Sequence, residues 1–399
     1  MDSTFSNGFQ IVANASNPKM LAEQALSTIQ GYLPGKGEPE NLPTVLVVAH
    51  YDAGGSAPSL SFGADANGSG VSILLELARI FGNLYKAGGE THAEYNLVFL
   101  LTGGGKLNYY GSKKWLEDQR DFQDQQKSDF LSNVKLVLCL DALGLEDSIN
   151  MHVSKPPKEG TPSGKFLKDL ETAASESKVK VNVVHKKINL ANDLLAWEHE
   201  RYSIAKLSAL TLSHLESHTD LSRSSITDVK VDPAVLARNT QVLAKALSCT
   251  VYGKCPDPAK VNLEPKAENL DEWTEILAKT PRGVGLLTGA KNPFAKSLFK
   301  AMDQATMKAK HILAKRDKRD ADYTLYDSPV ATINSYNIKP AFFDLILTVA
   351  IVAYLSLVYG VVSNTSAIYA FLASFVKTSA SSSPASPSKK AANGKSKAH

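Results

Sequence analysis

TVLVVAH, residues 44–50, is a continuous apolar run of strand length that ends in a histidine, and it decides the fold. Two further runs repeat the pattern, YNLVFLL at 95–101 and VKLVLCLD at 134–141. Strands that are apolar along their whole length are buried on both faces, as in parallel sheets covered by helices. Between the first two runs, residues 69–85 place apolar side chains at helical spacing. The sequence therefore predicts an α/β domain with a mostly parallel sheet.

The flanking sequence predicts more elements of this domain. Asn17 and Pro18 fit the start of a helix and Gly31 fits its end, so residues 17–31 are predicted to be helical. The remaining expected elements are helices at 164–177 and 232–253 and strands at 180–185 and 208–214.

The globular domain is expected to span residues 1–255, with the completeness of its N-terminal part left open. Two amphipathic helices are predicted beyond it, at 271–280 and 295–316. They form a helical linker over 256–340 that either packs on the domain or stands as a stalk.

Composition excludes several classes of protein. The 399 residues are 43% hydrophobic, which is enough to bury a core and excludes a disordered chain. The 44 Lys and Arg against 40 Asp and Glu leave a net charge of +4, too small and too evenly spread to predict nucleic-acid binding. Of the three cysteines, Cys249 and Cys255 could form a disulfide in an oxidising compartment, and Cys139 is expected to be a buried apolar residue.

A membrane span is predicted near the C-terminus. Residues 345–362 contain no charge, and the 22 residues from 341 to 362 make about 33 Å of helix at about 1.5 Å per residue. A buried helix of a soluble domain seldom runs this long without a polar face, so we expect a single-pass anchor in membrane lipid.

Residues 363–399 are predicted to form a disordered basic tail. Four lysines near its end, Lys389, Lys390, Lys395 and Lys397, favour a cytosolic location. The chain opens without an apolar leader, so either an upstream segment supplies the signal for a luminal main domain or the orientation is the opposite one.

Polar side chains follow three of the predicted strands. His50 and Asp52 follow the first run, Asp141 ends the third, and His218 follows the strand at 208–214. Ligands of an open α/β sheet bind at the carboxyl ends of its strands, and imidazole and carboxylate groups suit Zn²⁺. A metal site is one interpretation, although a single histidine is more often a hydrogen-bonded core or surface residue.

Over residues 40–250, the sequence resembles the co-catalytic zinc aminopeptidase family in the order and spacing of its motifs. The motifs are HYD at 50–52, GADANGSG at 63–70, GSKKWL at 111–116, LDALG at 140–144 and SHTD at 217–220. VLVVAHYDAGGSAP at 45–58, INLANDLLAWEHERY at 188–202 and the terminal span are similar to the nicalin branch, which is related to nicastrin. The resemblance implies a zinc-aminopeptidase-like, mixed and mostly parallel sheet flanked by helices, with a helical stalk and one C-terminal transmembrane helix.

Matching the family's site residues to this sequence leaves the site incomplete. His50, Asp52, Asp141 and His218 match ligand or neighbouring positions. The bridging aspartate corresponds to Ala66, and the general-base and ligand glutamates correspond to Gly105 and Lys106. The resemblance therefore implies a pseudoenzyme with no cofactor, because a general base and a bridged water are needed for two-metal hydrolysis.

Other interpretations stay open. Asp65 could replace the missing bridge, which would leave a membrane-anchored zinc aminopeptidase with an altered metal site. A degenerate pocket could instead bind a peptide or polar ligand without turnover. Two nearby motifs receive plainer interpretations: residues 103–106, GGGK, are expected to form a tight turn, and residues 197–201, WEHER, an exposed charged helical turn.

The resemblance also implies a cellular role. It predicts a single-pass subunit of an endoplasmic-reticulum membrane complex, with a luminal main domain and a cytosolic tail. The implied partners are a nodal modulator-like protein, a small polytopic membrane protein and the translocon. The implied processes are biogenesis of multi-span membrane proteins and modulation of Nodal signalling. Of the glycosylation sequons, Asn14 is the expected acceptor.

Overall fold

The structure is a computed structural model that describes residues 9–126, 130–316, 322–327, 331–337 and 341–380. The chain divides into two compact units. One unit is Pro18–Ser328, and the other combines the two ends of the chain.

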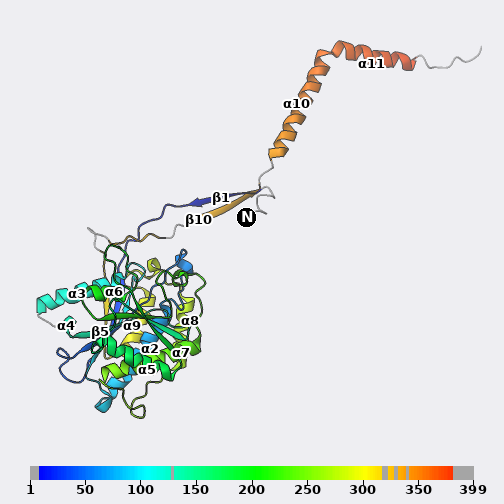
Figure 1. The fold of residues 1–399 in the computed structure, drawn as a ribbon. Coiled ribbons are helices and arrows are strands. Elements are labelled where there is room, and N and C mark those ends of the chain that lie inside the picture. Colours follow the sequence, from blue (N-terminus) through cyan, green and yellow to red (C-terminus); the bar gives the residue numbers. More distant parts are fainter. Residues whose placement is uncertain (1–8, 127–129, 317–321, 328–330, 338–340, 381–399) are drawn as a thin grey trace, which may run out of the picture. The chain divides into compact units, whose positions relative to one another are not determined.

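An eight-stranded mixed sheet forms the centre of the Pro18–Ser328 unit (Figure 1). Its strands, in spatial order, are β7 (Lys180–His185), β6 (Ser148–Val153), β8 (Ala209–Ser213), β5 (Val134–Leu140), β3 (Thr44–His50), β4 (Asn96–Thr102), β2 (Leu26–Leu33) and β9 (Lys308–Ala314). The central strands β8, β5, β3 and β4 are parallel, whereas β2 pairs antiparallel with both β4 and β9. The predicted mostly parallel α/β fold is confirmed.

Helices cover both faces of this sheet. The alternation of β3 shows it, because Val45 and Val47 lie in one apolar cluster and Leu46 and Val48 lie in another. The first face carries α2 (Gly68–Ala87), α5 (Pro162–Glu176), α7 (Pro233–Val251), α8 (Ala267–Lys279) and α9 (Pro293–Ala305). The second carries α3 (Tyr110–Gln126), α4 (Phe130–Asn133) and α6 (His199–Ile204). Short 3₁₀ turns occur at Pro58–Leu60, Gly89–Thr91, Leu221–Ser224 and Val284–Leu287.

Most of the expected elements of the domain are confirmed as α2, α5, α7, β7 and β8. The helix expected at 17–31 is wrong, because residues 26–33 form β2 with its side chains buried between β4 and β9. The helix expected at 295–316 ends at Ala305, and Lys308–Ala314 form the edge strand β9 instead. The capping residues of the first segment suited a helix, but burial in a sheet overrides such local preference.

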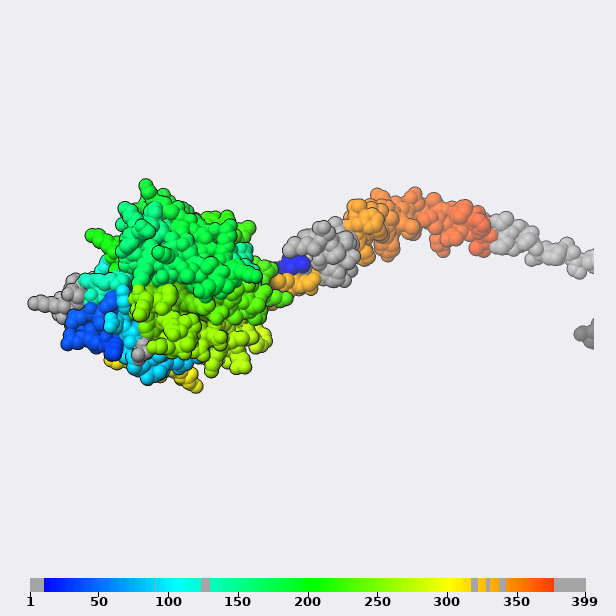
Figure 2. Space-filling view, turned by 60° about the horizontal axis from the view of Figure 1, so that its bottom comes forward, coloured from blue at the N-terminus to red at the C-terminus, as the bar shows by residue number. Residues whose placement is uncertain are grey.

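The segment that follows residue 255 packs on the domain. Helices α8 and α9 contribute Leu270, Leu277, Leu298 and Met302 to the first apolar cluster. Figure 2 shows this yellow-green segment as part of the surface of the compact body. Position 255 therefore lies inside one compact unit. The possible disulfide is formed between Cys249 and Cys255, and Cys139 is a free, buried cysteine as expected.

The two ends of the chain form the other unit. Strand β1 (Phe9–Ala15) pairs antiparallel with β10 (Ala331–Asn337), followed by α10 (Ala341–Ser363) and α11 (Thr365–Ala380). Within the described residues one helix, Phe342–Ser363, is long and apolar enough to cross a membrane. The predicted disorder of 363–399 is wrong for residues 365–380, where apolar residues at helical spacing form α11. Residues 381–399, with the four tail lysines, lie outside the described residues.

Candidate functional site

The parallel strands β3, β5 and β8 end at the same edge of the sheet, beside a cavity of about 860 Å³. The cavity is lined by His50, Gly105, Lys106, Asn108, Tyr109, Ala191–Ala196, His218–Leu221, Arg223 and Ser224. The sequence-predicted positions His50, Gly105, Lys106 and His218 thus share one cavity. This is the edge at which open α/β sheets bind ligands.

His50 ends β3 and is held by a buried glutamate. Its Nδ1 lies 3.2 Å from Oε2 of Glu198. Glu198 is 2% exposed, and its Oε1 accepts hydrogen bonds from Ser112 Oγ at 2.5 Å and Thr102 Oγ1 at 2.9 Å. The Nε2 of His50 is buried and has no hydrogen-bond partner among the described residues. The imidazole is therefore fixed by one nitrogen and presents the other within the site.

Asp141, which directly follows β5, forms a buried ion pair with Arg223. Its Oδ2 lies 2.5 Å from Nη2 of Arg223, and the two side chains are 3% and 10% exposed. The guanidinium also stacks 4.5 Å from the ring centroid of Trp197. Burial by itself would raise the pKa of Asp141, but Arg223, and after it His50 and Lys106, outweigh burial and hold that pKa below its usual value.

Lys106 adds a second cation. Its Nζ donates a hydrogen bond to the backbone oxygen of Arg223 at 3.1 Å. Burial, and then the charge of Arg223, lower the pKa of Lys106 to about 8. The backbone oxygen of His218 accepts a hydrogen bond from Arg223 Nη1 at 3.3 Å, and burial lowers the pKa of its half-buried imidazole. Both cations line the cavity beside His50, and the carboxylates that line it are those of Asp193 and Asp220.

Asp52 organises the turn that carries Lys106. Its carboxylate accepts the backbone N–H groups of Gly105 at 2.7 Å and Lys106 at 2.8 Å. A Cβ atom added at Gly105 would lie 2.2 Å from Cδ2 of His50. Gly104 adopts a left-handed backbone with φ of 81°. The expected tight turn with close backbone approach is confirmed, and this backbone leaves no room for a glutamate side chain at position 105.

The loop that carries Ala66 is held by hydrogen bonds to the carboxylates of Asp228 and Asp65. The carboxylate of Asp228 accepts the backbone N–H groups of Asp65 at 2.9 Å and Ala66 at 2.8 Å. Asp65 accepts from the backbone N–H of Gly144 at 2.7 Å, and its Oδ2 lies 2.6 Å from Nε2 of His214. The Asp65 carboxylate is therefore engaged by Gly144 and His214. The alternative in which Asp65 replaces the missing bridge gains no support from these contacts.

Two residues of the site were missed by the sequence analysis. The interpretation of residues 197–201 as an exposed charged turn is wrong, because Trp197, Glu198, His199 and Glu200 are between 2% and 4% exposed. The carboxylate of Glu198 is satisfied by His50, Ser112 and Thr102, so its charge can be buried. Arg223 lies three residues after SHTD, and no motif marks it. Their role depends on contacts between segments far apart in the sequence.

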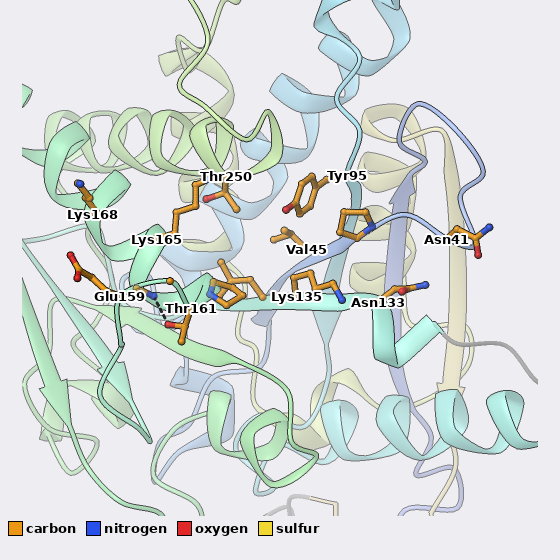
Figure 3. Close-up of a pocket in the computed structure, with 15 residues that line it drawn as sticks. Asn41, Val45, Tyr95, Asn133, Lys135, Glu159, Thr161, Lys165, Lys168 and Thr250 are labelled. Atoms are coloured by element: carbon orange, nitrogen blue, oxygen red, sulfur yellow. Dashed lines mark hydrogen bonds between the residues drawn. The ribbon is translucent and has the colours of Figure 1, made fainter.

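A second cavity of about 910 Å³ lies at the opposite, amino ends of β3 and β5 (Figure 3). Val45, Lys135, Thr161, Lys165 and Thr250 are among the residues around it. The lysines make hydrogen bonds nearby, Lys165 Nζ to Gly253 O at 2.8 Å and Lys135 Nζ to Ser132 O at 3.2 Å. None of the candidate ligand positions His50, Asp52, Asp141 and His218 lines this cavity. The candidate site is therefore the His50 cavity.

Residues 29–245 match the family described as Peptidase family M28. A zebrafish protein named "BOS complex subunit ncln" is 43% identical over 393 residues, which cover 92% of this chain and 68% of that protein. The chain belongs to peptidase family M28, in its nicalin branch. The human "BOS complex subunit NCLN" is 46% identical, and the Caenorhabditis elegans protein named "Nicalin" is 33% identical over 62% of this chain and 46% of its own length. The match covers 91% of this chain and 66% of the human relative, slightly less than two thirds of that protein.

The fold of this M28 chain is similar to that of nicastrin. The crystal structure described as the gamma-secretase component nicastrin matches with a TM-score of 0.61 and 11% sequence identity, over 80% of this chain and 69% of that chain. At this identity the match establishes the fold alone. The resemblance expected from the motifs, to the nicalin branch and its nicastrin-like fold, is confirmed.

The residues of this nicalin-branch site do not fit a pair of zinc ions. In the described part of the chain, no three ligand atoms of His50, Asp52, Asp141 and His218 lie within 4.8 Å of one another. The cluster that meets this distance is Asp169, Cys249 and Cys255, whose sulfur atoms are joined in the disulfide. Zinc sites use three or four protein ligands. Asp52 is committed to a backbone turn and Asp141 to Arg223, so no reaction step is assigned to a metal here.

Proposed function

We propose that this chain is a non-catalytic, peptidase-like subunit of an endoplasmic-reticulum membrane complex. The relatives named as BOS complex subunits support a subunit role, and the apolar helix Phe342–Ser363 supports membrane anchoring. The proposed partners are a nodal modulator-like protein, a small polytopic membrane protein and the translocon. The proposed processes are multi-pass membrane protein biogenesis and modulation of Nodal signalling.

The ion pair of Arg223 with Asp141 carries the non-catalytic part of the proposal. The guanidinium occupies Oδ2 of the carboxylate, and the ammonium of Lys106 lines the same cavity. A metal on the other oxygen would lie about 4 Å from this guanidinium, at a cost of about 4 kcal/mol per unit of metal charge when the effective dielectric constant is near 20. For a divalent ion the repulsion is about 8 kcal/mol before Lys106 is counted. The vestigial positions His50, Asp52, Asp141 and His218 are therefore proposed to serve the fold.

We also propose that the main domain is luminal and that residues after the span are cytosolic. The Cys249–Cys255 disulfide supports an oxidising compartment, because disulfides persist in the lumen and are rare in the cytosol. Asn14 lies exposed on β1 and is the proposed glycosylation site. Residues 341–362 are the proposed transmembrane segment. The helix α10, Ala341–Ser363, supports these bounds.

Affinity purification tests the subunit role. The full chain would be purified in mild detergent beside a variant in which residues 341–362 are deleted, and co-purifying membrane proteins would be identified by mass spectrometry. We expect translocon-associated proteins with the full chain and their loss from the deletion variant. Recovery of no such protein with the full chain would refute the subunit role.

A further inference from the structure

Helix α11 (Thr365–Ala380) is a separate short helix with one apolar side. It begins after a single residue, Asn364, that follows the last residue of α10. At about 100° per residue, its large apolar residues fall within one sector of about 160°. These residues are Ile368, Tyr369, Phe371, Leu372, Phe375 and Val376. The opposite side carries small residues, Ser366, Ala370 and Ala373.

The apolar side of α11 is accessible in this structure. Tyr369 is 79% exposed, Phe371 63% and Leu372 57%. The rings of Phe371 and Phe375 contact each other along this side, with centroids 4.9 Å apart in a T-shaped arrangement. Such a side on a helix of 16 residues requires a covering surface, since so much apolar area is seldom left in water.

The length and position of α11 indicate which surface this is. Sixteen residues span about 24 Å, less than the hydrocarbon core of about 30 Å, so α11 is too short for a second span. Its first residue lies two positions beyond the end of α10, which would end at one surface of the bilayer. From 345 to 380 the sequence contains no acidic residue and a single charge, Lys377. A helix with one apolar side and no acidic residue can lie in the lipid interface with that side buried.

We propose that α11 binds the surface of the same bilayer that α10 crosses, with its apolar side among the upper acyl chains and its small-residue side toward water. The bound partner is membrane lipid. The inference rests on the proposed anchoring by α10. Its consequence is that α11 fixes the depth of the span and holds the tail close to the membrane.

The cysteines of the chain allow a direct test in the full-length protein. Cys139 is buried and Cys249 is paired with Cys255, so an introduced exposed cysteine can be labelled selectively with the fluorophore NBD. We would label Leu372→Cys on the apolar side and Ala373→Cys on the opposite side, one residue away. Ile351→Cys in the middle of α10 reports on the span itself. Each protein would be reconstituted in phosphatidylcholine vesicles that carry a doxyl quencher either near the headgroup or near the end of the acyl chain.

The proposal predicts a different result at each position. Emission at Ile351 is lost with the deep quencher, emission at Leu372 is lost with the shallow quencher, and emission at Ala373 is little changed by either. Equal, unquenched emission at Leu372 and Ala373 would overturn the proposal while leaving the anchor intact. Deep quenching at Leu372 would overturn it in favour of insertion into the bilayer core. Unquenched emission at Ile351 would show that the anchor itself is wrong.

Discussion

Truncation of Arg223 tests the buried ion pair most sharply. In Arg223→Ala, the carboxylate of Asp141, 3% exposed, loses its partner. Removing one member of a buried pair costs about 3–5 kcal/mol, because the other charge is left without compensation. The compact unit Pro18–Ser328 has an unfolding entropy of about 0.65 kcal/mol/K at about 2.1 cal/mol/K per residue, so Tm should fall by about 5–8 °C.

The assay is thermal unfolding of the full chain in one detergent at one scan rate, followed by circular dichroism. Arg238→Ala is the matched control, because Arg238 pairs with Asp147 where the side chains are 29% and 63% exposed. Such a surface pair contributes at most about 1 kcal/mol. Adding Asp141→Asn to Arg223→Ala should recover part of the loss, since the uncompensated charge is gone. Equal Tm values for the two arginine variants would refute the account of the pair.

The acid dependence of the same pair has a definite sign. The pKa of Asp141 is lowered in the folded protein, so its contribution to stability is complete above the pKa of an unfolded aspartate and is lost as pH falls through the lower, folded value. Three further changes are informative. Gly105→Ala should lower the free energy of unfolding by about 1–3 kcal/mol, because the added Cβ overlaps the ring of His50. Gly285→Ala should be nearly neutral in the same denaturant titrations, because the nearest atom to its added Cβ, Cδ1 of Leu21, is 3.9 Å away. Because burial lowers the pKa of Lys106 to about 8, the folded protein binds fewer protons than the unfolded chain from about pH 8 to 10; stability in urea should rise over that range and rise less in Lys106→Met. Glycosidase treatment should change the mobility of the wild type but not of Asn14→Gln, because Asn67 is fully buried and donates to two backbone oxygens; a second glycan at Asn67 would contradict this.

The sequence predicts the centre of the sheet because its signal there is local. Strands β3, β4 and β5 are apolar at nearly every position, and burial on both faces requires that pattern. The edge of the sheet is different. β9 reads KAKHILA, a mixture of polar and apolar side chains without strict alternation that also suits the end of a helix, and pairing with β2 decides its conformation.

In the site, too, some residues are marked by local sequence and others only by contacts between distant segments. His50 and Asp141 were predicted because they end apolar strands, and parallel strands bring their carboxyl ends together. Arg223 could not be predicted, because it lies in the short 3₁₀ turn Leu221–Ser224 and meets Asp141 82 positions away in the sequence. Glu198 looked like part of a solvated charged run, and its burial depends on hydroxyl groups of α3 and β4 that no local pattern reveals.

Zinc content per chain tests the central claim most directly. The full-length protein would be purified without chelators in buffer containing micromolar zinc, passed through a desalting column, and measured by inductively coupled plasma mass spectrometry beside His50→Ala. Because Arg223 pairs with Asp141 and Lys106 lines the same cavity, we predict the same substoichiometric zinc in both proteins. One or two zinc ions per chain that disappear in His50→Ala would contradict the account and favour the membrane-anchored zinc aminopeptidase.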